Sequence, residues 1–472
     1  MELEQEPIPS QPTVDPDAPL DKVALICLSA QHLSVTWTQR TAEFATYLFL
    51  IDLFPTTLLP SALYGFFSTL AGVLFAGDIG TLVTNRSRLR TIRLNILICK
   101  SSVTIIYGLL LVLLVAYSKE AYAAGEGIGK GGHPVVWTLF ALLVLTSCIS
   151  KLGDIGMSIA VERDWVTTIA NGSSSHLTLL NLWLRRIDLM CKLGAPLLTG
   201  LLTTTVGNVK SGIVLVSAAL GTLGFEIFWI GVVWDRFPVL HDRVEAVVEM
   251  EMEDVEDPGR TGVTATTSRE GRHQIGGHRR WTQDWLMFLR NPVFPSSLAI
   301  SLLYFTTLSF DGTMISWMKT NAYSDPLISG MRGVAVLAGL LGTMVMPFLE
   351  ERIGLARTGN WSIWFVFSLS CNLLRVETHG MGRFEVIALV PALVSFFVGS
   401  PTGIPAPRWN QALLFGGISA SRIGLWSFDL CQIKLLQLSL VDHPRRGTLT
   451  GLQYALQNVL DLLRYVMLVV LS

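Results

Sequence analysis

Ionisable side chains interrupt several long apolar runs of this 472-residue sequence. In SRIGLWSFDL (421–430), Arg422 and Asp429 are separated by two helical turns, so they share one face of a helix. Four further stretches of the same kind are TQRTAEF (38–44), RRID (185–188), LSFDG (308–312) and DLLR (461–464). A charge inside a bilayer is costly, so its default interpretation is functional: cation binding, proton transfer or ion pairing between helices.

A structural interpretation competes with the functional one at the helix ends. Arg and Asp side chains in that position often join two helices as a fixed clasp. For Arg422, Asp429, Arg185 and Asp164 the two interpretations are equally supported by the sequence.

Three acidic residues favour a substrate or proton role more strongly. Glu43 and Asp188 lie deeper within their apolar runs. Asp311 precedes Gly312 in FTTLSFDGTMIS, a run broken by Ser, Gly and Thr. Broken helices expose backbone carbonyl groups at membrane depth and often border a transport site.

The elements that carry these residues are predicted to be membrane-spanning helices. Half of the residues are apolar and only 15% are charged, whereas soluble domains have about 25% charged residues. The mean hydropathy is +0.50, and apolar windows of spanning length recur along the chain. Serial spans in lipid must be helical, because each backbone polar group needs an internal partner. The expected fold class is an all-α polytopic membrane protein whose partner is the lipid bilayer.

Composition and motifs exclude other classes. The net charge is −1 and there is no basic tract, so no nucleic-acid partner is expected. The sequence lacks a nucleophile elbow, a phosphate-binding glycine loop and an H-E-x-x-H motif. We therefore expect no enzyme and no cofactor.

The apolar runs divide the chain into two lobes with about 11 spans. We predict a disordered cytosolic tail (1–22), an N-lobe of six helices (23–235), a cytosolic linker (236–284) and a C-lobe of about five helices (285–472). Residues 365–383 are either an insertion into one C-lobe span or part of two short segments.

Loop charges give the orientation. Arginine-rich loops such as NRSRLRTIR (85–93) and HPRRG (443–447) fall on one side of the membrane if the spans alternate, which predicts a cytosolic N-terminus. Trp281 and Trp285 indicate an amphipathic surface helix before the seventh span.

Several stretches together resemble ferroportin, the iron exporter of solute carrier family 40. The stretches occur in the family's order and include LYGFFSTLAGVLFAGDIG (63–80), ERDW (162–165), RRID (185–188), SRIGLWSFDL (421–430) and GLQYALQNVLDLLRY (451–465). The resemblance implies a major-facilitator-like fold of two six-helix lobes and export of Fe(II), as substrate, by alternating access. It implies twelve spans, so the last would be missing here. We expect a monomer in the plasma or vacuolar membrane.

The resemblance also implies ion pairs that close a cytosolic gate between the lobes. The first pair would be Arg185 with Asp429, and a second pair would be Asp164 with Arg88. We further expect Arg422 to orient Asp429 from the same helix face.

The N-lobe metal site departs from the family pattern but keeps oxygen donors. Family members place an Asp, and four residues later a His, on the first span, where this chain has Gln39 and Glu43. Asp188 matches the family's metal-site Asp on the fifth span. Such oxygen donors suit hard ions such as Mn(II) or Mg(II), with Fe(II) still possible.

The C-lobe site departs further. The family's Asp-Cys on the seventh span is Asp311-Gly312 here, and its His is replaced by Arg464, which cannot ligate a metal. Without that Cys, no peptide-hormone regulator is expected. These changes leave two alternatives open: a major-facilitator transporter of another substrate, or a degenerate homologue that does not transport.

Overall fold

A computed structural model describes residues 21–54, 59–116, 134–241, 277–305, 318, 323, 325–368, 407–441, 443 and 445–471 of the chain. All regular elements in these ranges are helices. Four predicted features lie outside the described residues, wholly or for the most part: the tail (1–22), the linker (236–284), the Asp311-Gly312 pair and the segment 365–383.

In the described part of the chain, six long helical elements form the N-terminal half. They are α1 (Lys22–Leu53), α2 (Leu59–Asn85), α3 (Arg88–Ala116), α5 (Pro134–Met157) with its continuation through η2 (Ser158–Trp165) and α6 (Val166–Ala170), α7 (Ser174–Val206) and α8 (Asn208–Arg236). A short 3₁₀ turn, η3 (Pro238–Leu240), follows α8.

Local sequence signals set two of these helix starts. The Asp21 carboxylate caps α1 by accepting a hydrogen bond from the Val23 backbone N–H, at 2.9 Å. Helix α6 ends at Asn171, which adopts a left-handed conformation with φ 44°, and Ser173 then caps α7.

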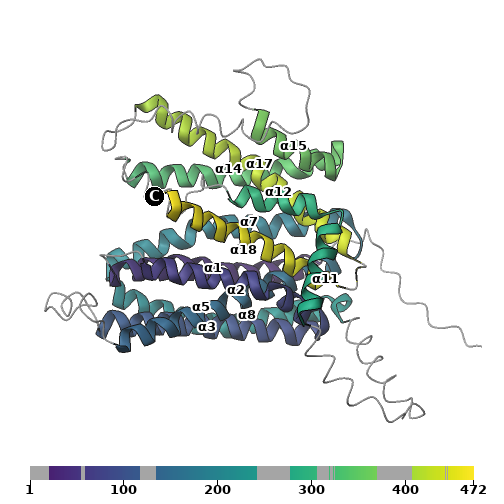
Figure 1. Ribbon diagram of the computed structural model, residues 1–472. Helices are drawn as coiled ribbons and strands as arrows, with labels where there is room; N and C mark the ends of the chain where they lie inside the picture. Colours follow the sequence, from purple (N-terminus) through teal and green to yellow (C-terminus); the bar gives the residue numbers. More distant parts are fainter. Residues whose placement is uncertain are drawn as a thin grey trace, which may run out of the picture.

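The C-terminal half contains α11 (Gly277–Arg290), α12 (Phe294–Phe305), α14 (Asp325–Ile353), α15 (Leu355–Ser368), α17 (Arg408–Leu440) and α18 (Arg446–Leu471). Helix α11 is the amphipathic helix expected around Trp281 and Trp285, and it begins inside the segment predicted as a linker. Figure 1 shows it running across one end of the bundle. The chain bends by 95° between α11 and α12.

Among the described residues, six helices are long and apolar enough, by length and composition, to cross a membrane, or seven if the bent pair α11–α12 counts as one span. Helices α1 and α17 have spanning length but are less apolar, because the ionisable residues of interest interrupt them.

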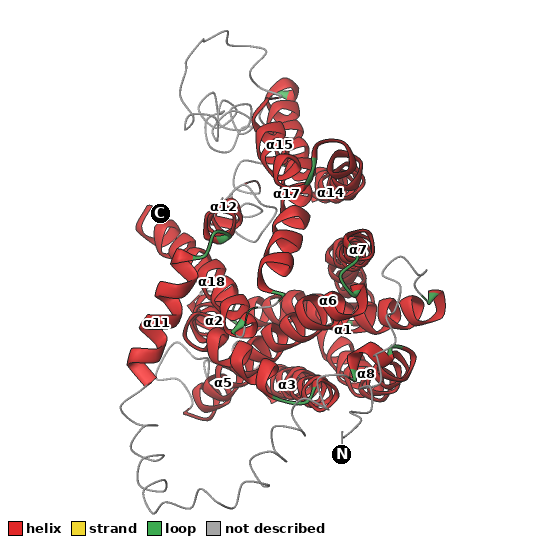
Figure 2. Ribbon diagram, turned by 90° about the vertical axis from the view of Figure 1, so that its right-hand side faces the viewer, coloured by secondary structure: helices red, strands yellow, loops and turns green. Residues whose placement is uncertain are grey.

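The two halves meet mainly along three pairs of helices. Helix α2 packs along α18, and α7 packs against α14 and α17. Figure 2, a view along the bundle, shows α14, α15 and α17 on one side and α1, α3, α5 and α8 on the other. We call the end where α2, α6 and α17 finish and α3, α7 and α18 begin the gate end. There the Gly80 and Gly447 backbones approach so closely that a Cβ on either would overlap the other helix.

Candidate functional site

A cavity of about 290 Å³ lies between the two halves, and we call it the central cavity. Side chains from α1, α5, η2, α7, α17 and α18 line it. Predicted site residues on its wall are Gln39, Glu43, Asp188, Arg185 and Asp429. The structure therefore brings together the N-lobe donors and the first predicted ion pair, which lie on three different helices.

Asp188 is the most crowded group in the central cavity. Its Oδ1 accepts hydrogen bonds from Arg40 Nη2 at 2.7 Å and Arg40 Nε at 3.2 Å. Its Oδ2 lies 2.9 Å from Lys192 Nζ and 3.3 Å from Arg185 Nη1. Arg40 also donates to Glu43 Oε2 at 2.8 Å. Both carboxylates predicted for the metal site thus face internal cations.

The donors are not arranged around a shared metal position in this structure. The described part of the chain contains no group of three or more His, Cys, Asp or Glu side chains that could hold a metal ion. A metal could use Gln39, Glu43 and Asp188 together only after side chains move. Their assignment as ligands stays a prediction.

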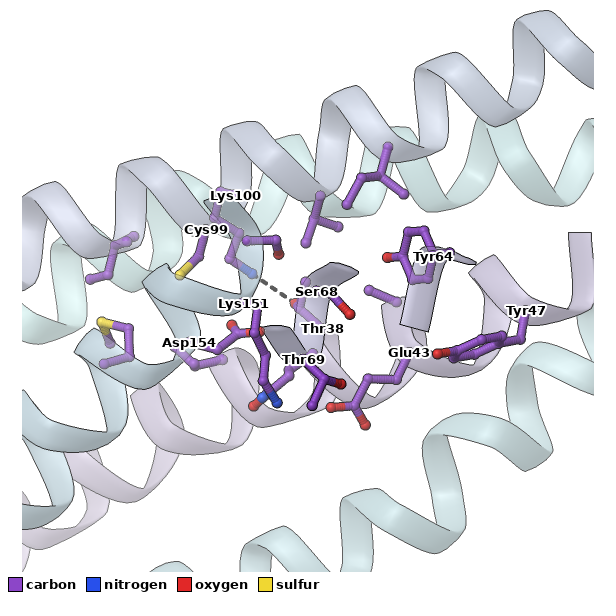
Figure 3. Close-up of a pocket in the computed structure, with 18 of the residues that line it drawn as sticks. Thr38, Glu43, Tyr47, Tyr64, Ser68, Thr69, Cys99, Lys100, Lys151 and Asp154 are labelled. Atoms are coloured by element: carbon purple, nitrogen blue, oxygen red, sulfur yellow. Dashed lines mark hydrogen bonds between the residues drawn. The ribbon is translucent and has the colours of Figure 1, made fainter. Parts of the chain in front are cut away.

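A second cavity, of about 270 Å³, continues from the central cavity into the N-terminal half. The two share Gln39, Glu43, Lys151, Asp154 and Asp461. Figure 3 shows Glu43, Lys151 and Asp154 close to Thr69, with Tyr47 and Tyr64 farther along the pocket.

Lys100 fixes the wall of this second cavity. Its Nζ lies 2.7 Å from Glu226 Oε1 and donates to Thr38 Oγ1 at 2.7 Å and Thr222 Oγ1 at 2.9 Å; Figure 3 draws the bond to Thr38. Sequence reasoning missed this ion pair. A lone Lys within an apolar run was the available signal, but nothing in the sequence pointed to Glu226.

The first predicted ion pair is present in the structure. Arg185 Nη2 on α7 forms an ion pair with Asp429 Oδ2 on α17; the Asp429 side chain is buried and that of Arg185 is partly buried. Trp426, one turn earlier on α17, lies beneath two cations, with its ring centroid 5.2 Å from Arg185 Cζ and 4.5 Å from Lys192 Nζ. The contact joins the two halves, whereas its role as a gate stays a prediction.

The second predicted pair is present but does not join the halves. Arg88 Nε lies 2.8 Å from Asp164 Oδ2, and both residues belong to the N-terminal half, on α3 and η2. Arg446, at the start of α18, bonds Asp164 Oδ1 and makes the connection between the halves. The expectation that Arg88 and Asp164 form an inter-lobe pair is therefore wrong, because both residues belong to the N-terminal half of the chain.

Asp164 belongs to a π-helical segment, η2, at the gate end. Element η2 widens the helix that continues from α5 and carries Glu162, Arg163 and Asp164. Its neighbour α17 accepts a hydrogen bond from Arg163 Nη1 at the Ile433 carbonyl, at 3.2 Å, and Gln437 Nε2 donates to the Glu162 carbonyl at 2.6 Å. π-helical turns are rare and often occur at functional sites.

Lys434 makes a third contact at the gate end that sequence reasoning missed. Its buried ammonium pairs with Glu350 of α14 in its own half. It also donates to the Ser174 carbonyl at 3.0 Å and to Thr178 Oγ1 at 2.5 Å, both on α7 of the other half. Thr178 in turn donates to Glu350 Oε2 at 3.1 Å. This is a closed polar network across the boundary.

The remaining predicted residues are only partly placed. Arg422 lies on α17 two turns before Asp429 and is half-buried. Arg464 lies on α18, and its side chain is outside the described part of the chain, as are Asp311 and Gly312. The C-lobe part of the predicted metal site stays a prediction.

Comparisons with known proteins give a consistent result. The family model described as Ferroportin1 (FPN1) matches residues 22–472. Solute carrier family 40 member 1 of Oryza sativa subsp. japonica is 29% identical over 470 residues, which cover 98% of this chain and 88% of the relative. Ferroportin of Homo sapiens is 26% identical over 494 residues, which cover 93% and 84%.

Solved structures share the fold. A bacterial homologue of the iron transporter ferroportin in its outward-facing state with soaked iron has a TM-score of 0.67 and 20% identity, covering 93% of this chain and 90% of that chain. The inward-facing state of a bacterial homologue has a TM-score of 0.59, also at 20% identity, covering 94% and 91%.

Proposed function

The chain belongs to the ferroportin family, and on that premise we propose that it exports a divalent transition metal, Fe(II) in the first place, by alternating access. The observation that carries the proposal is the central cavity. It lies between the two halves, is lined by charged side chains from both, and adjoins the contacts that hold the halves together at one end. Transporters that rock two halves around a mid-membrane site need this combination.

Gln39, Glu43 and Asp188 are the proposed metal ligands. They line one cavity from α1 and α7 and offer amide and carboxylate oxygen atoms. Such oxygen donors suit Fe(II) and Mn(II) better than softer ions. Loading requires that the cations around Asp188 give way, since they hold both of its oxygen atoms.

The gate end is proposed to be the cytosolic side, with the N-terminus also cytosolic. The pairs Arg185–Asp429 and Asp164–Arg446 would then close the inner entrance while the metal leaves on the other side. Ion pairs across a moving boundary favour one of two states by their own free energy, so they can shift a nearly balanced equilibrium.

Metal flux in proteoliposomes tests the proposal. Purified wild-type protein is reconstituted, and uptake of Fe(II), Mn(II) and Co(II) is compared with that of Asp188→Ala. The matched control is Asp78→Ala, which removes an exposed carboxylate on α2, away from both cavities.

We expect flux with the wild type and with Asp78→Ala, and a loss of tenfold or more with Asp188→Ala. Flux that is independent of Asp188 would contradict the assigned site. An absence of flux for all three metals would contradict metal export.

A further inference from the structure

We propose that Lys192 is a tethered competitor of the metal: when the gate end is closed, its ammonium occupies the Asp188 carboxylate and thereby drives release. The inference rests on the proposed function and deepens it by naming a residue that positions charge at the same site. Neither the motifs of the sequence nor the ion pairs expected from them pointed to Lys192.

The first step of the argument is that Asp188 has no free acceptor position. A carboxylate offers about four lone-pair sites. Arg40 contributes two N–H groups to Oδ1, and Lys192 and Arg185 each approach Oδ2. A divalent metal can therefore bind Asp188 only if at least one of these nitrogen atoms withdraws.

The second step separates Lys192 from the two arginines. Arg40 also holds Glu43, and Arg185 also holds Asp429, so each has a second carboxylate when it leaves Asp188. Among the described contacts, the ionic partner of Lys192 is Asp188. The two residues lie one turn apart on α7, so the ammonium stays within reach of the carboxylate wherever α7 moves. A tethered group competes at a high effective concentration.

The third step connects the competitor to the state of the gate. Lys192 Nζ lies 4.5 Å from the centroid of Trp426, which belongs to the other half. The Trp426 ring packs closely against Gly339 of α14. A Cβ added at Gly339 would lie only 2.6 Å from Trp426 Cδ1. The ring therefore holds the ammonium over Asp188 while the halves are together, through a cation–π contact. Opening of the gate end would carry Trp426 away with α17.

The consequence is a difference in metal affinity between the two states. With Trp426 in place, Lys192 competes strongly and the metal is released; with Trp426 withdrawn, Lys192 is freer to leave and the metal can load. A desolvated cation–π contact corresponds to roughly a tenfold change in an equilibrium constant. A ligand can shift such an equilibrium only by its differential affinity, and Lys192 would supply that difference.

Binding and flux of Co(II) test the inference on the full-length protein. The variants are Lys192→Met, Lys192→Arg, Lys151→Met and Trp426→Phe. Calorimetry in detergent gives Kd, and proteoliposome flux gives KM and kcat. Lys151 lines the same cavity on α5, so Lys151→Met reports the general effect of removing a positive charge there.

We expect Lys192→Met to lower Kd and KM by roughly tenfold, the size of one charge-assisted hydrogen bond, and to lower kcat because release slows. Lys192→Arg should stay close to wild type. Trp426→Phe should shift Kd in the same direction as Lys192→Met but by less, and Lys151→Met should have a smaller effect than Lys192→Met. Tighter Co(II) binding combined with a lower kcat would not arise from a purely structural role of Lys192.

Two results would overturn the inference: unchanged Kd and kcat in Lys192→Met, or an equal shift in Lys151→Met. Its failure can be distinguished from failure of the export proposal. Flux by the wild type together with unchanged Kd and kcat in Lys192→Met would contradict the competitor role of Lys192 but not the export proposal. Tighter Co(II) binding by Lys192→Met, without flux in the wild type or any variant, would support the competitor role of Lys192 and contradict the export proposal.

Discussion

Arg185 on α7 and Asp429 on α17 form a largely buried ion pair across the boundary between the two halves. The same guanidinium reaches Asp188, one turn farther along α7, at 3.3 Å. One side chain therefore contacts both the proposed metal ligand and the proposed gate. A motion that separates α7 from α17 at this level would take Asp429 away from Arg185 and so change how strongly Arg185 is held beside Asp188.

Charge reversal tests whether this ion pair matters for transport. Arg185→Glu and Asp429→Arg each place like charges in contact, so we expect each to lower metal flux by tenfold or more. The double variant should recover part of the flux in proteoliposomes. Recovery is expected to be incomplete, because Arg185→Glu also puts a second carboxylate beside Asp188. A double variant as inactive as the singles would show that the pair does not act as a unit.

Two adjacent arginines should behave differently. Arg446 bonds the buried carboxylate of Asp164 across the boundary, whereas Arg445 pairs with Asp284 with its own side chain 47% exposed. Exposed pairs contribute about 0–1 kcal/mol, while removal of one partner of a buried pair costs several times more. We expect Arg446→Ala to reduce flux strongly and Arg445→Ala to keep it within about twofold. Equal losses in the two variants would argue against Asp164–Arg446 as a gate contact.

The network around Lys434 makes a prediction about stability. Lys434→Met leaves the Glu350 carboxylate without its ammonium in a largely buried position, which costs about 3 kcal/mol. Thermal unfolding in detergent should therefore occur at a lower temperature. Lys434→Met combined with Glu350→Gln should unfold at a higher temperature than Lys434→Met alone, because no charge is then left unpaired. A double variant less stable than Lys434→Met would contradict the pairing.

Close backbone packing at the gate end predicts a steric effect. A Cβ at Gly80 would overlap the Gly447 carbonyl group, so Gly80→Ala should push α2 away from α18 and cost about 1–3 kcal/mol. We expect lower flux and a lower unfolding temperature. Gly221→Ala on α8 is the matched control, since nothing lies within 4 Å of a Cβ there. Similar losses in both variants would mean that the close approach is unimportant.

The sequence alone was sufficient for the fold class and for the family. Apolar runs of spanning length can satisfy their backbone only as helices, and α1, α2, α3, α5, α7 and α8 are such helices. The amphipathic pattern around Trp281 likewise predicted α11. The spanning helices and the amphipathic helix depend mainly on residues close in sequence, so the local pattern of apolar and polar residues is enough to predict them.

Pairing within one helix can also follow from the sequence, although no motif drew attention to Lys192. Asp188 and Lys192 are four residues apart, and helical periodicity puts them on one face. The family resemblance pointed to Arg185 with Asp429, and the structure contains that contact.

The other contacts between distant helices were decided only by the tertiary structure. Lys100 meets Glu226 because α3 lies against α8, and Asp164 reaches Arg446 because α2 and α18 pack closely enough to bring η2 and the start of α18 together. The period of a helix determines which side chains share its face, but not what that face meets. That choice depends on how all the helices rotate and pack at once, and so it also decided that Asp188 is surrounded by cations.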